Sequence, residues 1–314
     1  MGTPELAATS LKALLAVQGF DVVGVVTQPD RPNGRDLKLT PSPVKLVAQL
    51  AGKPVMQPVK ARDDAFIAQL RTIQPDLIAV AAFGQILPAA ILNLPRHGCL
   101  NVHTSLLPKY RGAAPIQAAL LNGDPETGIT IMKMDVGLDT GDILTQRATP
   151  ILAQDNAQTL HDRLAQLGAE LLVETIQGYV AGGIQARPQP TEGISHVPKI
   201  TKEQGRINWQ RPATEISNQI RAFTPWPGAF TFLGLVPTGV DPTKPATMLK
   251  IWEAQVVEEV GTPGELLRAD KQGIVIGCGS GALQIVVLQR EGGRRMTAAE
   301  FLAGHALQIG SQLS

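Results

Sequence analysis

The first half of the chain alternates between helical and strand-like patterns of apolar residues. Leucines between residues 6 and 15 recur with helical spacing, and apolar runs at 21–27 and 77–82 are typical of buried parallel strands. Further helical patterns cover residues 44–50, 63–73 and 159–180, and further strand patterns surround Cys99 and cover 130–134. Strands that alternate with helices predict an α/β fold with a Rossmann-like parallel sheet and helices on both faces.

The pattern changes near residue 182. Residues 183–202 are rich in glycine, proline and polar side chains, which indicates a linker. A short amphipathic helix is expected next, and short strands with glycine-rich turns are then predicted at 249–257, 273–276 and 283–288. We therefore expect an α/β domain over 1–182, the linker over 183–202, and a small β-barrel domain over 203–314.

Composition places the chain among ordinary globular proteins. Of its 314 residues, 44% are hydrophobic and 18% are charged, which is far from the composition of disordered chains. No apolar run of about 18 residues and no signal peptide are recognisable, so we expect neither a membrane span nor secretion. Cys99 and Cys278 lie in different predicted domains and form no metal or redox spacing, which favours a reduced, cytoplasmic compartment.

Charge gives no support for nucleic-acid binding by a whole domain. Lysine and arginine together number 28, and aspartate and glutamate number 27, for a formal net charge of +1. Nucleic-acid binders usually carry a clear basic excess, so any RNA contact must use local basic clusters. The candidates are Arg31, Arg35, Lys38 and Lys45, then Lys199, Lys202, Arg206 and Arg211, then Arg290, Arg294 and Arg295. On charge alone, each cluster is better explained as a solvated face.

The polar residues that indicate chemistry are Asn101, His103 and Asp139. Residues 98–102 form a short apolar strand, and because strand side chains alternate, Asn101 and His103 point the same way. Ligands of open α/β sheets bind beyond the carboxyl ends of strands. An amide and a cationic imidazole can stabilise the oxyanion of a tetrahedral intermediate, and a carboxylate can orient the imidazole.

These residues favour acyl transfer without a covalent enzyme intermediate. Neither the segment around Asn101 and His103 nor the segment around Asp139 contains a serine or cysteine in a nucleophile elbow, so direct attack by a substrate amine is favoured. The structural alternative is that polar residues at the strand end only satisfy the turn. Asp135 and Asp142 compete with Asp139 as the carboxylate.

A family resemblance selects among these alternatives. The segments Asn101–Ile116 and Met134–Ile143 resemble the active-site motifs of the formyltetrahydrofolate-dependent formyltransferases. The segments Thr27–Arg35 and Arg221–Pro227 narrow the resemblance to the members that act on initiator methionyl-tRNA. The resemblance covers nearly the whole chain, and implies that 1–182 is the catalytic domain and that the C-terminal domain is an OB-like barrel that contributes to tRNA binding.

The resemblance also implies the reaction and its residues. The formyl group of 10-formyltetrahydrofolate, a co-substrate, passes to the α-amino group of the methionine on initiator tRNA. His103, protonated, and Asn101 stabilise the oxyanion, while Asp139 holds His103 in its cationic form and helps to relay protons. We expect a monomeric enzyme without a metal, because the five histidines lack ligand spacing.

Binding residues follow from the same match. The residues expected to contact folate are Ser105, Leu106, Leu107 and Pro108, together with Phe83, Gly84 and Leu87; for Phe83 and Leu87, core packing is an equally good explanation. The residues expected to contact tRNA are Arg31, Arg35 and Lys38, in a loop predicted over 29–43.

The chain departs from the family at its start. In the family, an apolar strand precedes the Gly-Thr-Pro turn and lies centrally in the sheet, whereas here that turn is Gly2-Thr3-Pro4. We expect a gap in the sheet between the strands at 21–26 and 77–80, because unpaired backbone groups would remain on both neighbours. We also expect the natural reading frame to encode about seven further residues, enough for a short strand.

Three other functions are consistent with the same sequence features. The first is another folate-dependent formyltransferase, and the second is a hydrolase that releases formate from formyltetrahydrofolate. The third is a tRNA-binding module that is inactive through truncation. Formyl transfer to charged initiator tRNA, compared with charged elongator tRNA, distinguishes them.

Overall fold

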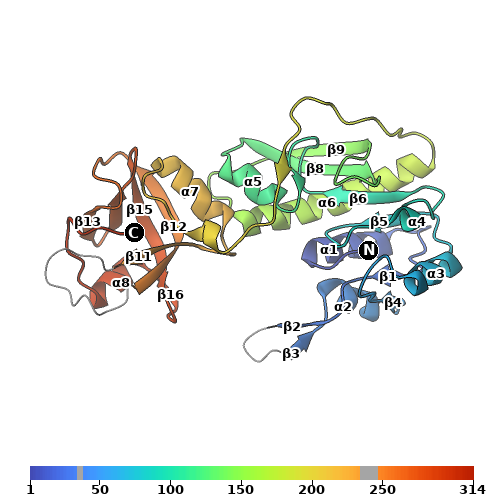
Figure 1. Ribbon diagram of the computed structural model, residues 1–314, viewed down its shortest axis with the longest axis horizontal. Helices are drawn as coiled ribbons and strands as arrows, with labels where there is room; N and C mark the ends of the chain where they lie inside the picture. The colour runs from blue at the N-terminus through green and yellow to red at the C-terminus, as the bar shows by residue number, and fades with distance from the viewer. Residues whose placement is uncertain (34–37, 234–246) are drawn as a thin grey trace. The chain divides into compact units, whose positions relative to one another are not determined.

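The computed structural model describes residues 1–33, 38–233 and 247–314, which form two units (Figure 1). The first unit comprises Met1–Pro115, Glu126–Pro150 and Leu160–Val197, and the second comprises Ile116–Pro125, Ile151–Thr159 and Pro198–Ser314. Most of the segment with linker composition therefore clusters with the first unit, up to Val197.

The elements of the first half alternate much as the apolar pattern predicts. In chain order they are α1 (Glu5–Ala16), β1 (Val25–Val26), β2 (Arg31–Asn33), β3 (Lys38–Thr40), α2 (Pro43–Leu50), β4 (Val55–Met56), α3 (Asp64–Ile73), β5 (Ile78–Val80), α4 (Ala89–Leu92), β6 (Cys99–His103), β7 (Arg111–Gly112), α5 (Pro115–Leu121), β8 (Glu126–Lys133), β9 (Ile143–Pro150), α6 (Ala157–Val180) and β10 (His196–Val197). The strand β9 and the two-residue strands β4, β7 and β10 had no clear signal in the sequence, whereas β1 lies within the predicted run 21–27.

The first unit contains a sheet of four strands in the order β5-β6-β8-β9 and a separate pair of strands, β1 and β4. β1 pairs with β4 and β5 pairs with β6 in parallel, which confirms the predicted Rossmann-like part. β8, however, runs antiparallel to both β6 and β9, so this part of the sheet departs from the predicted parallel arrangement. For β8 and β9 the physical reason is the connection, which is a loop without a crossover helix, and such loops join antiparallel neighbours. β6 and β8 are also antiparallel, although α5 lies between them in the chain.

Met1 and Gly2 lie between the two parallel pairs. The Gly2 amide donates to the Val26 carbonyl oxygen at 2.9 Å, and Met1 accepts from the Ala81 amide at 2.9 Å. Beside them, a cavity of about 770 Å³ opens between residues 19–26 and 73–81. Met1 and Gly2 also line this cavity, which lies between the two segments where a gap in the sheet was expected.

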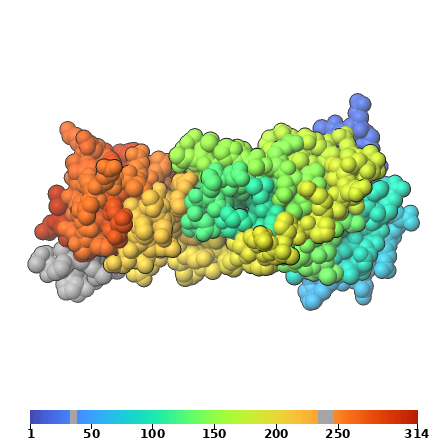
Figure 2. All heavy atoms as spheres, turned by 90° about the horizontal axis from the view of Figure 1, so that it is seen from above, coloured from blue at the N-terminus to red at the C-terminus, as the bar shows by residue number. Residues whose placement is uncertain are grey.

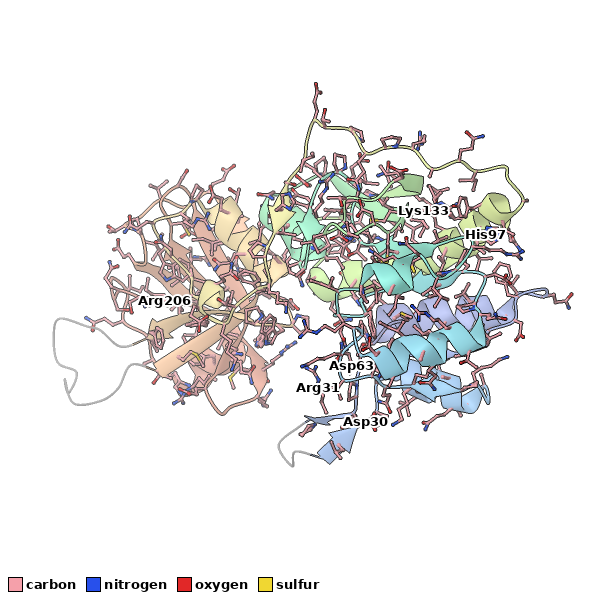
Figure 3. The ribbon with its side chains drawn as sticks, turned by 45° about the vertical axis from the view of Figure 1, so that its right-hand side comes forward. Asp30, Arg31, Asp63, His97, Lys133 and Arg206 are labelled. Carbon is pink, nitrogen blue, oxygen red and sulfur yellow. The ribbon has the colours of Figure 1, made fainter. Side chains whose placement is uncertain are left out.

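A hairpin replaces the loop predicted over 29–43. β2 and β3 pair antiparallel, with Arg31 opposite Thr40, and residues 34–37 lie outside the described part of the chain. Figure 3 labels Asp30 and Arg31 where the chain enters this hairpin. The Asp30 carboxylate accepts hydrogen bonds from Lys45 Nζ at 2.6 Å and from Gln57 Nε2 at 2.8 Å, which lower its pKa. These bonds anchor the base of the hairpin.

The second unit is built on antiparallel strands. Its elements are η1 (Glu203–Gly205), α7 (Ala213–Ala222), β11 (Ala229–Leu233), β12 (Thr247–Val257), β13 (Leu266–Asp270), β14 (Gly273–Gly277), β15 (Ala282–Arg290), β16 (Arg295–Thr297) and α8 (Ala298–Gly304). The strands follow the order β11-β12-β15-β14-β13, and β16 pairs with β15. The three strands and the amphipathic helix predicted from the sequence are confirmed.

The C-terminal residues connect the two edges of this sheet. Leu313 forms an antiparallel bridge with Leu233 in β11, and Gln312 forms one with Glu265 beside β13. The edges of the sheet are therefore linked through the last residues, as in a small barrel. Its core holds the predicted helix face with Ile216 and Ile220.

A capping box begins α8 and makes the second unit sensitive to acid. Thr297 Oγ1 accepts from the Glu300 amide at 3.2 Å, and Glu300 Oε2 accepts from the Thr297 amide at 2.8 Å. The hydrogen bond from the Thr297 backbone, followed by that from Arg294, lowers the pKa of Glu300 to about 2. Because the folded pKa lies below the ordinary value of 4.5, the carboxylate stabilises the fold above that pH, and this effect is lost as the pH falls towards 2.

Glu300→Gln is therefore expected to lower the melting temperature of the second unit at pH 7. The difference in melting temperature between the variant and the unmodified chain should shrink as the pH falls below 4.5. Thermal unfolding measured between pH 7 and pH 3 would show this. Glu291→Gln, at an exposed position, serves as the control. A difference that stays constant down to pH 3 would contradict the role of the charged carboxylate.

Candidate active site

His103 and Asp139 meet at the end of β6. His103 is only 6% exposed, and its Nδ1 lies 3.7 Å from Oδ1 of Asp139. Its Nε2 lies 3.0 Å from the Tyr110 carbonyl oxygen. A carbonyl oxygen can only accept, so Nε2 carries the hydrogen and the carboxylate faces the other nitrogen. Protonation of Nδ1 would therefore place a cation between two acceptors.

The loop between β8 and β9 presents Asp139 in a constrained geometry. Asp139 adopts the left-handed conformation with φ +54°, which is unfavourable for a residue with a Cβ atom. Its Oδ2 accepts the Gly112 amide at 2.8 Å. Asp135, a competing carboxylate in the sequence, instead accepts the Gly137 amide at 3.0 Å and the Thr140 hydroxyl at 2.7 Å. Asp135 thus shapes the loop, while Asp139 faces the imidazole.

Asn101 lies two residues before His103 on β6, on the same face of the strand. Within the described residues, its side-chain amide has no hydrogen-bond partner, although the residue is partly buried. A partly buried amide with free donors can bind a substrate oxygen.

The loop expected to contact folate is held by internal hydrogen bonds. Ser105 is fully buried, and its hydroxyl donates to the Lys109 carbonyl oxygen at 2.6 Å. Thr130 Oγ1 donates to the Ser105 carbonyl oxygen at 2.7 Å and accepts the Leu107 amide at 3.0 Å. Leu107 is 3% exposed, whereas Leu106 and Pro108 are partly exposed. Ser105 and Leu107 therefore shape this loop, and Leu106 and Pro108 offer its accessible surface.

Phe83 and Leu87 belong to the core of the first unit. They are 2% and 4% exposed, so the core-packing explanation holds for both side chains. Phe83 and Gly84 also border a second cavity of about 490 Å³, which Gln28 and Arg31 line from the other side. Gln28 Nε2 donates to the Phe83 carbonyl oxygen at 3.0 Å. The structure thus brings one residue expected to bind tRNA beside two expected to bind folate.

The basic residues near the hairpin have different environments. Arg31 is exposed and donates to Gln28 Oε1 at 3.2 Å, so its charge faces solvent. Lys45 is committed to its ion pair with Asp30. Arg35 lies outside the described residues, as does the side chain of Lys38. Their part in tRNA binding stays a prediction.

Sequence reasoning missed Gln189, which contacts the loop that carries Asp139, and Arg111, which contacts Gln189. Arg111 is buried, with 8% exposure, and Gln189 Nε2 donates to the Asp139 carbonyl oxygen at 2.8 Å. Gln189 lies in a segment with linker composition, and a single glutamine in such a segment carries no signal.

The structure shows neither a metal cluster nor a membrane span in the part of the chain it describes. No group of three or more histidine, cysteine, aspartate or glutamate side chains there could hold a metal ion. Not one of the described helices combines the length and hydrophobicity that crossing a bilayer requires. Cys99 and Cys278 are buried free thiols, and burial raises the pKa of Cys99 to about 12.

Comparison with known proteins covers both units. Residues 1–176 match the family model described as formyl transferase, and residues 199–306 match the formyl transferase C-terminal domain. The methionyl-tRNA formyltransferase of Geobacter sulfurreducens is 49% identical over 313 residues, with 100% of this chain and 95% of the relative covered. That of Caldanaerobacter subterraneus is 48% identical over 316 residues, with 100% and 98% covered.

Solved structures share the fold at lower identity. An N-formyltransferase from Helicobacter canadensis, in complex with folinic acid and dTDP-3-aminofucose, is 21% identical with a TM-score of 0.64 and covers 94% of this chain and 97% of its own. HypX from Aquifex aeolicus in complex with tetrahydrofolic acid is 19% identical with a TM-score of 0.59, and the match covers 91% of this chain and 50% of HypX.

Proposed function

This chain belongs to the methionyl-tRNA formyltransferase family, whose members transfer a formyl group from formyltetrahydrofolate to methionyl-tRNA, and we propose that Asn101, His103 and Asp139 perform the transfer here. The observation that carries this proposal is the pair of His103 Nδ1 and Asp139 Oδ1 at 3.7 Å, at the end of the strand that also bears the Asn101 amide. These are the groups that acyl transfer through an oxyanion requires.

The proposed mechanism is a direct attack of the methionyl amine on the formyl carbon of 10-formyltetrahydrofolate. As the new C–N bond forms, the carbonyl electrons move to oxygen, and the Asn101 amide and the His103 imidazolium stabilise this oxyanion. Asp139 stabilises the positive charge on His103. The attacking nitrogen loses a proton to the Asp139 carboxylate. The oxyanion then reforms the C=O bond, the bond from the formyl carbon to the folate nitrogen breaks, and the leaving folate nitrogen takes up the proton that the amine gave to this pair.

The folate co-substrate is proposed to bind along the loop 105–108, where Leu106 and Pro108 are accessible. The cavity bordered by Phe83 and Gly84 would extend this site. A protein of the same fold, HypX, binds tetrahydrofolic acid, which supports folate as a ligand of this chain.

The tRNA is proposed to contact the β2–β3 hairpin through Arg31, Arg35 and Lys38, and the second unit through its barrel-like sheet. We further propose that the protein acts in the cytoplasm, because translation initiation takes place there. We also propose that it acts as a monomer. The direct test of the function is formyl transfer to charged initiator tRNA, with charged elongator tRNA as the control. Release of formate without tRNA, and no transfer, would instead identify a hydrolase.

Arg31→Ala is expected to raise the Michaelis constant for initiator tRNA. The Arg31 side chain is exposed, so its loss removes a contact with tRNA and no packing. The slope of the logarithm of tRNA affinity against the logarithm of salt concentration should flatten by about one unit per lost phosphate contact. Arg35→Ala should act in the same way.

The matched control is Arg62→Ala, at another exposed position of the first unit. If the Arg31 variant keeps both the tRNA kinetics and the salt slope of the control, the hairpin has no part in tRNA binding.

A further inference from the structure

The segment that follows α6 is bound to the active-site loops rather than free. Between residues 187 and 197, which we name the connecting segment, the backbone pairs with two separate parts of the first unit. Arg187 exchanges hydrogen bonds with Ile143 at 2.9 and 2.8 Å, Ser195 accepts the Arg111 amide at 2.8 Å, and Val197 accepts the Ala113 amide at 3.0 Å. Figure 1 shows the segment returning from the end of α6 past β8 and β9 to β10, and Figure 2 shows its yellow atoms against the green ones.

Gln189 uses its whole side-chain amide in this arrangement. Its Nε2 donates to the carbonyl oxygens of Asp139 and Gly141, both at 2.8 Å. Its Oε1 accepts from Arg111, at 3.1 Å from Nε and 2.7 Å from Nη2. Two donors and both lone pairs of the acceptor are therefore occupied, which is the full capacity of a glutamine side chain.

Gln189 supports the backbone of Asp139, the carboxylate that faces His103. Asp139, with φ +54°, adopts a backbone conformation that is intrinsically unfavourable and needs support from its surroundings. Gln189 provides that support at the carbonyl oxygen of Asp139 itself. It also accepts from the buried Arg111 guanidinium through its neutral amide oxygen, while Oδ1 of the Asp139 carboxylate lies 3.7 Å from His103 Nδ1.

The other side of the imidazole is held by the same segment. Tyr110, whose carbonyl oxygen accepts from His103 Nε2, is also in the left-handed region with φ +60°. Its amide donates to Ser195 Oγ at 2.8 Å. The connecting segment thus contacts both partners of the His103 ring, Asp139 through Gln189 and Tyr110 through Ser195.

We propose that Gln189 is a positioning residue for formyl transfer, which acts by fixing the Asp139 loop against His103. The inference rests on the proposed function, since it needs Asp139 to assist His103 in catalysis. Gln189 touches neither of the reacting groups, and it contacts the Asp139 loop through the backbone carbonyl oxygens of Asp139 and Gly141. A small displacement of a catalytic group lowers turnover much more than it lowers binding.

The test is Gln189→Met, which preserves the length of the side chain and removes all four hydrogen bonds. We expect the turnover number to fall about tenfold to a hundredfold, with little change in the Michaelis constants for folate and tRNA. Gln185→Met, at an exposed position in the same stretch, is the control and should keep full activity.

A double-mutant cycle then separates the inference from the proposed function. In an Asp139→Ala background, Gln189→Met should cause no further loss, because its effect depends on Asp139. Full activity of Asp139→Ala alone would overturn the proposed function. Full activity of Gln189→Met, or a loss that multiplies with that of Asp139→Ala, would overturn the role of Gln189.

Gln189→Glu guards against a simple loss of folding. Its carboxylate can still accept from Arg111 but cannot donate to the two loop carbonyl oxygens, so we expect a stable protein with the same fall in turnover. A stable Gln189→Glu variant with full turnover would also overturn the proposal.

Discussion

Replacing His103 with alanine is expected to lower the turnover number for formyl transfer by about a hundredfold or more, a typical loss for an acid–base or oxyanion-binding group. Asn101→Ala should cause a similar loss, because its amide is free to bind the oxyanion. Folate binding should change little in either variant, since the folate is proposed to contact the loop 105–108 instead. Single-turnover formyl transfer and equilibrium folate binding provide the two measurements.

His196→Ala is a suitable control for this experiment. His196 is exposed, and it contributes to the first unit through the backbone pairing of β10 with β7. The control should retain full turnover. Normal turnover in either His103→Ala or Asn101→Ala would show that the replaced residue takes no part in the mechanism.

Gly141→Ala is expected to disrupt both stability and activity. A Cβ atom at Gly141 would overlap the backbone carbonyl oxygen of Lys133, whose amide is fixed by a 2.8 Å hydrogen bond to Asp142. The loop that carries Asp139 must then move, and Gly141 would no longer present its carbonyl oxygen to Gln189. We expect the free energy of unfolding to fall by about 2 kcal/mol or more, as for overpacking at a rigid site, and turnover to fall as well.

The control for this change is Gly183→Ala, where the nearest atom to a new Cβ would be the Gly178 carbonyl oxygen at an ordinary 3.5 Å. Thermal melts and formyl transfer of the two variants should be measured side by side. Equal melting temperatures would show that the loop tolerates the extra atom and that close packing at Gly141 does not limit stability.

Local sequence patterns predicted the structural features that depend only on residues close together in the chain. The two-residue period of a strand was enough to place Asn101 and His103 on one face, because successive side chains alternate in any strand. The helices at 44–50, 63–73 and 159–180 were predicted from apolar spacing, and the structure forms them with limits shifted by one or two residues at most. The choice of Asp139 over Asp135 came from the family motif rather than from the pattern.

Tertiary contacts decided the rest. The direction of β8 depends on how the chain returns to the sheet, and the short β2 and β3 of the hairpin depend on anchors such as the Asp30–Lys45 ion pair, 15 positions apart. The sequence cannot distinguish whether Phe83 packs in the core or borders a cavity, because an apolar side chain suits both places. The structure shows that Phe83 does both.

The sequence by itself therefore determined the strand that bears Asn101 and His103, the family of the chain, and the alternation of helices and strands in its first half. Only the tertiary structure decided that Asp139 is held in the left-handed conformation and that Gln189, 50 positions away, supports it. The physical reason is that a hydrogen bond between a side chain and a distant backbone carbonyl depends on the folded path of both segments. Neither composition nor periodicity records that path.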